Sequence, residues 1–404
     1  MNGKRRWMWC GVLAWVVAGA LQTQAAPWAV TVGYFEDGGT TGAISTVDMG
    51  TVPPTVYGPF LAGQLGTNGG GLFDVAIAPG NVALVSGFGD SVVYKIDITD
   101  PQNPVLMGET NLPFFAEDIA VSPNGQFAMV TDGGFTPDVV YLDLATFTVT
   151  HLTLTGGYAN AVAIANDNET VLFADYFSGM IFYGKLNVNK DKVDPEPEPD
   201  PVFVEEKSID LTYNVEDMGR PVNVTISPDG RTALVSDAAT GLVHVLEIKA
   251  DGTVQMGATP RVPIHANLNA KNQSVAFTRD SKKAYVTIQF YNEAITNFEN
   301  FVSWLQINGP GNVSLGGSGV AKVAPAGGSQ LFGVDTIALT PDGKQVLYGN
   351  PTVSGGTNLL SVVDTTTWGV TLIDSKMYIP LGVAIQCRNA LNDYDGDGQS
   401  DMSL

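Results

Sequence analysis

The pattern from which the fold can be predicted is clearest in Val222-Asn-Val-Thr-Ile-Ser-Pro-Asp-Gly230, continued after Arg231 by Thr232-Ala-Leu-Val-Ser236. Two short runs rich in Val, Ile, Leu and Thr flank the Pro-Asp-Gly turn, as β-strands require. Proline sets φ at about −65° and glycine tolerates a positive φ, so the chain reverses tightly there. A second turn leads to the alternating strand Leu242-Val-His-Val-Leu-Glu-Ile248, and one more strand follows. The unit therefore consists of four short strands.

The same phrase recurs along the chain. Clear copies run over Phe73–Ser86, Asp118–Thr131 and Asn160–Ala174, and weaker ones over Ser274–Asp280 and Thr336–Gly343. Four strands in a unit of about 40 to 50 residues is the spacing of a β-propeller blade. A single blade cannot bury both faces of its sheet, so neighbouring blades pack face to face around an axis.

The two ends of the repeat predict how the ring closes. Ala29–Phe35 has the pattern of a second strand, with no first strand before it. Leu381–Gln386 repeats the Val-Ala-Ile phrase but lacks the strands that should follow. We therefore expect the C-terminal strand to complete the first blade as its innermost strand. With six complete first strands, this predicts an all-β, seven-bladed propeller; an open repeat, a two-sheet sandwich and rings of six or eight blades are the alternatives.

The unit VNVTISPDGRTALVSDAATGLVHVLEI resembles the YVTN-type β-propeller repeat, in which VAVSPDG, VYVTN and VSVID phrases recur. The resemblance covers roughly Ala29 to Gln386. It implies a propeller, and it leaves the function open, because that family includes surface-layer proteins, lactonase-like enzymes and exported proteins of unknown role.

Met1–Ala25 has the pattern of a secretory signal peptide. Lys4, Arg5 and Arg6 form a basic start, Trp7–Leu21 is apolar, and small residues precede Ala26. The alternative is a retained membrane anchor, for which the apolar run is short of the ~20 residues that span a bilayer. The expected organisation is a signal peptide at 1–25, a propeller at 26–386 and an acidic tail at 387–404. We expect export to the periplasm, cell surface or medium, with no transmembrane segment after cleavage.

Composition narrows the choice of partners. The 404 residues carry 20 Lys and Arg against 41 Asp and Glu, a formal net charge of −21. So acidic a surface repels phosphate, which argues against nucleic acid and anionic membranes. Cys10 lies in the signal segment, which leaves Cys387 alone and excludes an internal disulfide in the mature chain. We expect a monomer that binds a protein or carbohydrate surface ligand.

The tail contains the clearest chemical motif, Asp393-Tyr-Asp395-Gly-Asp397-Gly-Gln399-Ser-Asp401. Carboxylates at alternating positions can wrap around a cation, with the Gln399 carbonyl and Asp401 completing the sphere. Hard oxygen ligands favour calcium. The pattern resembles the calcium loops of FG-GAP and thrombospondin type 3 repeats, and departs from an EF-hand because Leu404 replaces the bidentate Glu. An acidic tail without a ligand is the alternative.

Polar residues just before the first strands should surround one mouth of the central channel. These candidates are Glu117, Asp118, Asn160, Arg220, Asn223, His265, Gln273 and Asp335, with Asp74 close by. Such a ring could hold a cation or a polar ligand. The simpler interpretation is that these residues cap strand ends and bind water.

Two insertions interrupt the period. Lys190–Pro201 alternates proline with acid, as in a solvated polyproline II segment. Phe290–Phe301 contains Tyr291, Phe298 and Phe301, and either covers the channel or forms an extra aromatic turn.

The sequence contains no nucleophile elbow, haem site or phosphate-binding loop, and no organic cofactor is expected. The favoured function is a secreted or cell-surface binding or scaffold module with calcium bound by its tail. The alternative is a lactonase-like hydrolase in which Glu117, Asp118 and Asp335 hold a cation at the mouth, with His265 or Arg220 near the substrate.

Overall fold

The structure is a computed structural model. It describes residues 27–35, 41–61, 63, 65, 70–134, 136–187, 201–212, 219–264, 271–272, 274–294, 297–317, 319–323, 335–350 and 358–387. The predicted signal peptide, the Lys190–Asp200 part of the acidic insertion and the calcium motif lie outside these residues.

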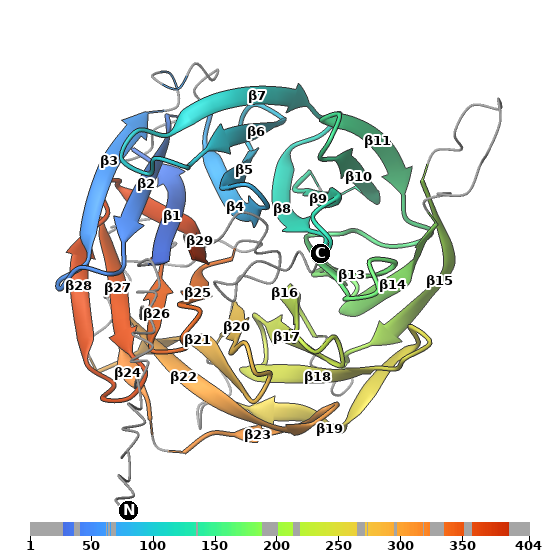
Figure 1. The fold of residues 1–404 in the computed structure, drawn as a ribbon. Helices are drawn as coiled ribbons and strands as arrows, with labels where there is room; N and C mark the ends of the chain where they lie inside the picture. Colours follow the sequence, from blue (N-terminus) through green and yellow to red (C-terminus); the bar gives the residue numbers. More distant parts are fainter. Residues whose placement is uncertain are drawn as a thin grey trace, which may run out of the picture.

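The described residues form seven small antiparallel sheets arranged as blades around a central axis (Figure 1). The predicted all-β, seven-bladed propeller is therefore confirmed. From the axis outward, the first blade consists of β29 (Ile379–Cys387), β1 (Pro27–Tyr34), β2 (Gly42–Asp48) and β3 (Thr55–Leu61). The second consists of β4 (Leu72–Ala78), β5 (Val82–Gly87), β6 (Val92–Asp97) and β7 (Val105–Asn111). The third consists of β8 (Ala116–Val121), β9 (Phe127–Asp132), β10 (Asp138–Asp143) and β11 (Thr148–Thr153).

The other four blades follow the same order from the axis to the rim. They are β12 (Ala161–Ile164), β13 (Thr170–Asp175), β14 (Met180–Asn187) and β15 (Val202–Asp210); β16 (Pro221–Ile226), β17 (Thr232–Asp237), β18 (Leu242–Ile248) and β19 (Val254–Pro263); β20 (Val275–Phe277), β21 (Lys283–Asn292), β22 (Asn297–Gly309) and β23 (Asn312–Leu315), with β24 (Ala321–Lys322) also on β22; β25 (Ile337–Leu339), β26 (Gln345–Tyr348), β27 (Leu359–Asp364) and β28 (Val370–Asp374).

The C-terminal strand closes the ring as predicted. β29 pairs antiparallel with β1, with Trp28 opposite Gln386 and Val30 opposite Ala384. In Figure 1 the last, red strand lies beside the first, blue strand on the axial side of the same blade. The first blade is thus built from both ends of the repeat, which joins the two ends of the propeller through backbone hydrogen bonds.

In three of the blades, a glycine shapes the turn between the first and second strands. Gly125, Gly230 and Gly343 have φ of 65°, 70° and 70°. Each glycine donates its N–H to the carbonyl three residues earlier, at 2.7 to 2.8 Å. Because L-residues with a Cβ are strained in this region, glycine fits the position.

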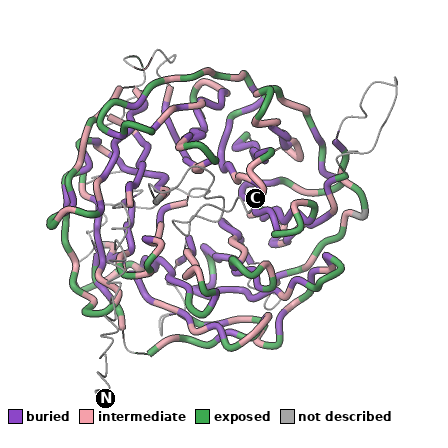
Figure 2. The backbone as a smooth tube through the Cα atoms, viewed as in Figure 1, coloured by how far each residue is buried: buried purple, intermediate pink, exposed green. Residues whose placement is uncertain are grey.

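The hydrophobic core lies between blades and not at the axis. Val30 and Ile44 of the first blade pack in one cluster with Leu72, Val85 and Tyr94 of the second. Similar layers join the other neighbouring blades. Figure 2 shows the buried residues along the inner and middle strands and the exposed ones at the rim. Each blade therefore depends on both neighbours.

The inner strands all begin at one end of the ring. All four exposed aromatic residues of the described chain lie on segments at this end, which we call the aromatic end: Phe115, Tyr158, Phe177 and Tyr291. Phe290–Phe301 also lies there, as the far part of the β21–β22 hairpin. No helix in the described residues is long and apolar enough to cross a bilayer.

Candidate functional site at the axis

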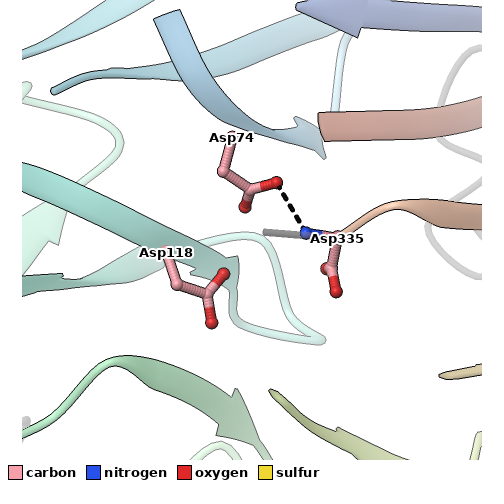
Figure 3. Close-up of side chains that lie close together, drawn as sticks. All are labelled: Asp74, Asp118 and Asp335. Carbon is pink, nitrogen blue, oxygen red and sulfur yellow. Dashed lines mark hydrogen bonds between the residues drawn. The ribbon is translucent and has the colours of Figure 1, made fainter. Parts of the chain in front are cut away.

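Three aspartates from three blades meet at the axis (Figure 3). Asp74 lies on β4, Asp118 on β8, and Asp335 two residues before β25. One carboxylate oxygen from each lies within 4.8 Å of the other two. We call these residues the axial triad, and three hard oxygens at this spacing are a donor set that a divalent cation could use.

Irregular pairing aims two of these side chains. The β4–β5 register shifts between Leu72 and Val75, and the β8–β9 register shifts between Ala116 and Ile119. At each irregularity the aspartate N–H donates to a side-chain hydroxyl of the second strand and not to a backbone carbonyl. The N–H of Asp74 donates to Ser86 Oγ at 2.9 Å, and the N–H of Asp118 donates to Thr131 Oγ1 at 3.0 Å. Bulges of this kind redirect side chains, here toward the axis.

The triad joins blades to one another. Asp74 accepts the backbone N–H of Asp335 at 3.1 Å and that of Ile119 at 3.4 Å. Asp118 accepts the N–H of Val162, in the next blade, at 2.7 Å. Each of these two carboxyls therefore receives donors from other blades.

Asp335 and a glycine extend these links to the remaining blades. Asn223 Nδ2 donates to Asp335 Oδ1 at 2.8 Å, and Ser274 Oγ lies 3.4 Å from the same oxygen. The N–H of Val383, on β29, donates to the Asp335 carbonyl at 2.8 Å. Beside it, a Cβ added to Gly382 would lie 2.7 Å from Asp74 Oδ1. Among the described residues, the polar groups at the axis thus connect all seven blades.

Burial raises the pKa of every carboxyl in the triad. For Asp74, the charge of Asp335 and then that of Asp118 add to burial, and its pKa lies well above the usual range. For Asp118, burial and the charge of Asp335 raise the pKa to about 7. Burial also raises the pKa of Asp335. A hydrogen bond between Asp74 and Asp118 raises the pKa of Asp74 and lowers that of Asp118, as when two carboxyls share a proton.

Glu117 lies beside the triad and is not part of it. Its side chain is 8 % exposed, and no hydrogen-bond donor in the described residues reaches its carboxyl. Burial, followed by the charges of Asp118 and Asp132, raises its pKa well above the usual range. A Cβ on Gly133 would lie 2.4 Å from Phe88 and 3.3 Å from the Glu117 Cβ, so these groups are packed together. The cation ligands proposed from the sequence were Glu117, Asp118 and Asp335. In the structure Asp74, and not Glu117, lies together with Asp118 and Asp335.

The other predicted mouth residues have different settings. Asn160 Nδ2 lies 3.4 Å from the Pro221 and Val222 carbonyls, and its Oδ1 accepts the N–H of Tyr176, so it joins two blades. Arg220 is exposed, donates to the Tyr176 hydroxyl at 3.0 Å and lies over that ring at 5.4 Å. His265 and Gln273 lie outside the described residues.

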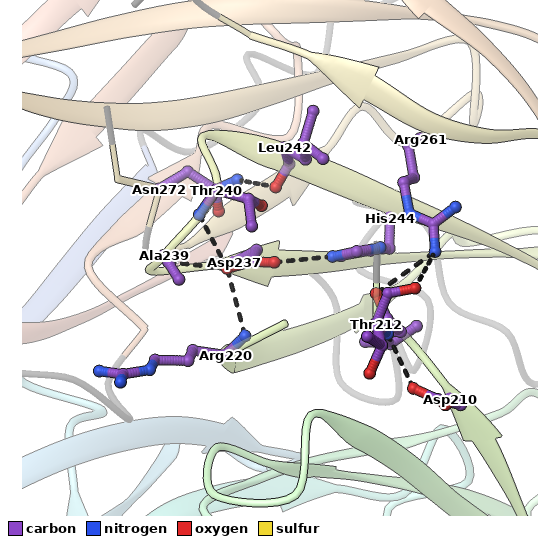
Figure 4. Close-up of polar contacts among 11 residues, drawn as sticks. Asp210, Thr212, Arg220, Asp237, Ala239, Thr240, Leu242, His244, Arg261 and Asn272 are labelled. Carbon is purple, nitrogen blue, oxygen red and sulfur yellow. Dashed lines mark hydrogen bonds and ion pairs between the residues drawn. The ribbon is translucent and has the colours of Figure 1, made fainter. Parts of the chain in front are cut away.

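A buried acid–base pair was not predicted from the sequence (Figure 4). His244 Nε2 lies 2.8 Å from Asp237 Oδ2, and both side chains are fully buried. Burial raises the pKa of Asp237, but the contact with His244 and the N–H of Ala239 lower it below its usual value. The pair fixes the β17–β18 turn. The sequence does contain an indication of this site, because an aspartate also ends the second strand of two other blades, as Asp132 and Asp175.

The triad lines neither of the two larger cavities described here. One, of about 940 Å³, lies at the opposite end of the ring and includes Asn124, Asp167 and Asn187 in its wall. The other, of about 440 Å³, lies at the aromatic end against the β21–β22 hairpin. Asp74 and Asp118 are instead buried between the blades that they connect, and Asp335 is half-buried.

Comparison with known proteins identifies the fold and not a family. No protein-family model and no curated protein sequence matches the chain. A functionally unknown protein from Desulfotomaculum acetoxidans is similar in structure, with a TM-score of 0.66, 18 % identity, and coverage of 89 % of this chain and 98 % of that one.

Two further solved structures are similar over the same extent. A candidate 6-phosphogluconolactonase from Bacteroides fragilis has a TM-score of 0.61 at 15 % identity, and a protein from Lactobacillus plantarum 0.62 at 14 %. Each alignment covers 89 % of this chain and 98 % of the other. At these identities the likeness is one of fold, and this chain is a seven-bladed β-propeller with structural neighbours of the 6-phosphogluconolactonase-like type.

Proposed function

We propose that the protein is an exported or cell-surface propeller that acts as a binding or scaffold module. The observation that carries this proposal is the use of the axial acids. Backbone N–H groups of other blades donate to Asp74 and Asp118, and side chains of two blades lie against Asp335, so these groups serve to hold the ring together. The signal-like sequence of Met1–Ala25 supports export.

The aromatic end is the proposed binding surface. Exposed aromatic side chains are common in binding surfaces, because they supply a large contact area at little entropic cost. Phe115 and Phe177 are 48 % and 46 % exposed, and ring contacts with Phe88 and Tyr158 hold them in place. A surface fixed in this way is organised before a ligand arrives.

Calcium bound by the tail is the second part of the proposal. Asp393, Asp395, Asp397, Asp401 and the Gln399 carbonyl would hold the ion, beyond the strand that closes the ring. The support is the spacing of the carboxylates in the sequence. Since the bidentate Glu of an EF-hand is missing, we expect an affinity of about 10⁻⁴ to 10⁻³ M.

The binding function can be tested by co-sedimentation of the purified mature protein with cell-envelope material of the producing organism. We expect the protein to pellet in a saturable way, whereas serum albumin added as a control stays in solution. Fractionation of the producing cells, with N-terminal sequencing, should find a mature chain that begins near Ala26. A cytoplasmic protein that begins at Met1 and never pellets would refute the proposal.

A lactonase-like hydrolase is the second candidate. Two observations favour it: the Asp118 pKa of about 7 suits a general acid or base near neutral pH, and the Glu117 carboxyl has no donor in the described residues. A panel of γ- and δ-lactones, followed at pH 5 to 8, tests it. The binding proposal predicts no turnover. Turnover that Asp118→Asn and Glu117→Gln both abolish, in proteins that remain folded, would establish the hydrolase.

A further inference from the structure

The β21–β22 hairpin extends beyond what a blade needs. Its strands pair at ten positions, from Lys283 opposite Gln306 to Asn292 opposite Asn297. The corresponding strands of the other six blades pair at four to seven positions in the described chain. The additional part projects at the aromatic end, and Phe290 and Phe301 at its base pack against the hydrophobic cluster between two blades.

A cavity of about 440 Å³ lies against this projection. This volume falls within the range of small-molecule sites. Its wall includes Lys271, Gln289, Tyr291, Asn292, Glu293 and Phe298. Lys271 comes from the segment before β20 and is held to the hairpin by paired backbone bonds to Gln289, at 2.7 and 2.8 Å. Two separate segments therefore build the wall.

Tyr291 presents an aromatic surface to solvent. It is 48 % exposed, and Phe298, directly opposite on β22, meets it edge-on with ring centroids 5.2 Å apart. One residue earlier, Phe290 stacks on Phe301 at 5.4 Å. The contact with Phe298 thus holds the exposed ring of Tyr291 against the hairpin.

The polar groups around this ring are also held in place. Asn292 Nδ2 donates to Glu299 at 2.7 Å, and Asn292 Oδ1 accepts the N–H of Ala294 at 3.0 Å. Gln289 is fully buried and donates to Asn300 at 3.2 Å. Amide groups in fixed positions can donate to one partner and accept from another.

The charges of the site favour a neutral ligand. Lys271 supplies a positive group and Glu293 a negative one, so neither an anion nor a cation gains a net attraction. Hydroxyl groups, which both donate and accept, match a wall that contains an ammonium group, a carboxylate and amides. The apolar face of a sugar ring matches the exposed ring of Tyr291.

We propose that this pocket binds a sugar unit of a neutral glycan, with the ring stacked on Tyr291 and its hydroxyls on Lys271 and Glu293. This inference rests on the proposed binding function and names its ligand class. The pocket lies on one blade and leaves the axial triad free of any role in binding.

The test is a titration of the purified mature protein, by saturation-transfer NMR and calorimetry, with neutral gluco-, manno-, xylo- and chito-oligosaccharides. At least one series should bind. Tyr291→Ala should weaken binding at least tenfold, while Tyr291→Phe, which keeps the ring, should stay within about threefold of wild type. Leu372→Ala is the control, since it removes a large apolar side chain of equal exposure (48 %) from the rim strand β28 of another blade, away from the aromatic end.

Binding by no series, or equal binding by Tyr291→Ala and wild type, would overturn the sugar site. Envelope co-sedimentation with the same variants separates this failure from that of the proposed function. If wild type and Tyr291→Ala pellet equally, the binding module stands and the sugar pocket falls. If wild type does not pellet, the general proposal fails, and the oligosaccharide titration still decides the pocket. Unchanged melting temperatures would show that the variants are folded.

Discussion

At the scale of single residues, the setting of Asp118 determines its chemistry. Its carboxyl is almost fully buried beside two other carboxyls, and its pKa rises from 3.8 to about 7. The folded protein therefore holds protons that the unfolded chain releases between about pH 4 and pH 7. The contribution of the triad to the free energy of unfolding is therefore complete below about pH 4. This contribution is lost as the pH rises from about 4 to about 7.

Asp118→Asn should reduce this pH dependence. The amide can still accept the Val162 N–H but carries no charge. The variant should be more stable than wild type at pH 8, by an amount on the order of a few kcal/mol, and lose this advantage at pH 5. Chemical denaturation across this range measures the effect. Asp97→Asn, at the opposite end of the ring, serves as control and should leave the difference between the two pH values unchanged.

Gly382 allows the last strand to approach the triad. A Cβ at this position would lie 2.7 Å from Asp74 Oδ1 and 2.9 Å from Asp74 Cα. Gly382→Ala should therefore destabilise the protein by about 2 kcal/mol or more, because a backbone contact cannot yield as a flexible side chain does. Gly108→Ala, where an added Cβ meets nothing within 4 Å, should change the unfolding free energy little. Equal stability of the two variants would contradict the close approach.

At the scale of elements, β29 stabilises the ring through three kinds of contact. It forms the axial edge of the first blade, and Leu381 and Val383 are buried in two hydrophobic clusters. Its backbone also binds the Asp335 carbonyl. One strand therefore contributes to blade closure, to the packing between blades and to the axial network.

A chain that ends at Pro380 should lose its cooperative thermal transition. The truncation removes the pairing with β1 from Val383 to Cys387 and exposes a strand edge at the axis. A chain that ends at Cys387 is the matched control and should melt with full-length protein. Circular dichroism melts and limited proteolysis can follow both. A Pro380 truncation with the full-length melting temperature would refute closure by β29.

At the scale of the whole molecule, the ring and the calcium motif are expected to be independent. The core lies between blades, and the closing strand ends before the motif begins. Stability of the propeller should then not depend on the tail, whatever the tail binds.

Asp393→Asn combined with Asp395→Asn should abolish millimolar calcium binding and leave the melting temperature of the propeller unchanged. Each substitution removes an anionic ligand and keeps the side-chain shape. Calorimetry on wild type and the double variant, both free of bound metal at the start, provides the measurement. Equal calcium uptake by the two proteins would place the ion elsewhere, and the axial triad would then be the next set of ligands to substitute.

The blade, its repetition and its closure could all be predicted from the amino-acid sequence. The pattern of Val222–Ser236 predicts the strands and the turn, and that of Leu381–Gln386 indicates which strand is missing from the first blade. These features are local: periodicity gives the strands, and proline and glycine give the turns. The same phrase, repeated, then required neighbouring blades to bury one another.

The set of acids that meet at the axis became clear only from the folded chain. Glu117 and Asp118 are adjacent in sequence, yet only Asp118 joins Asp74 and Asp335, because neighbouring residues of a strand point to opposite faces and a bulge at this position sets the direction. Asp335 meets partners 112 and 261 residues away, Asn223 and Asp74. Contacts at such separation depend on how the whole ring closes, and no short stretch of the chain specifies them.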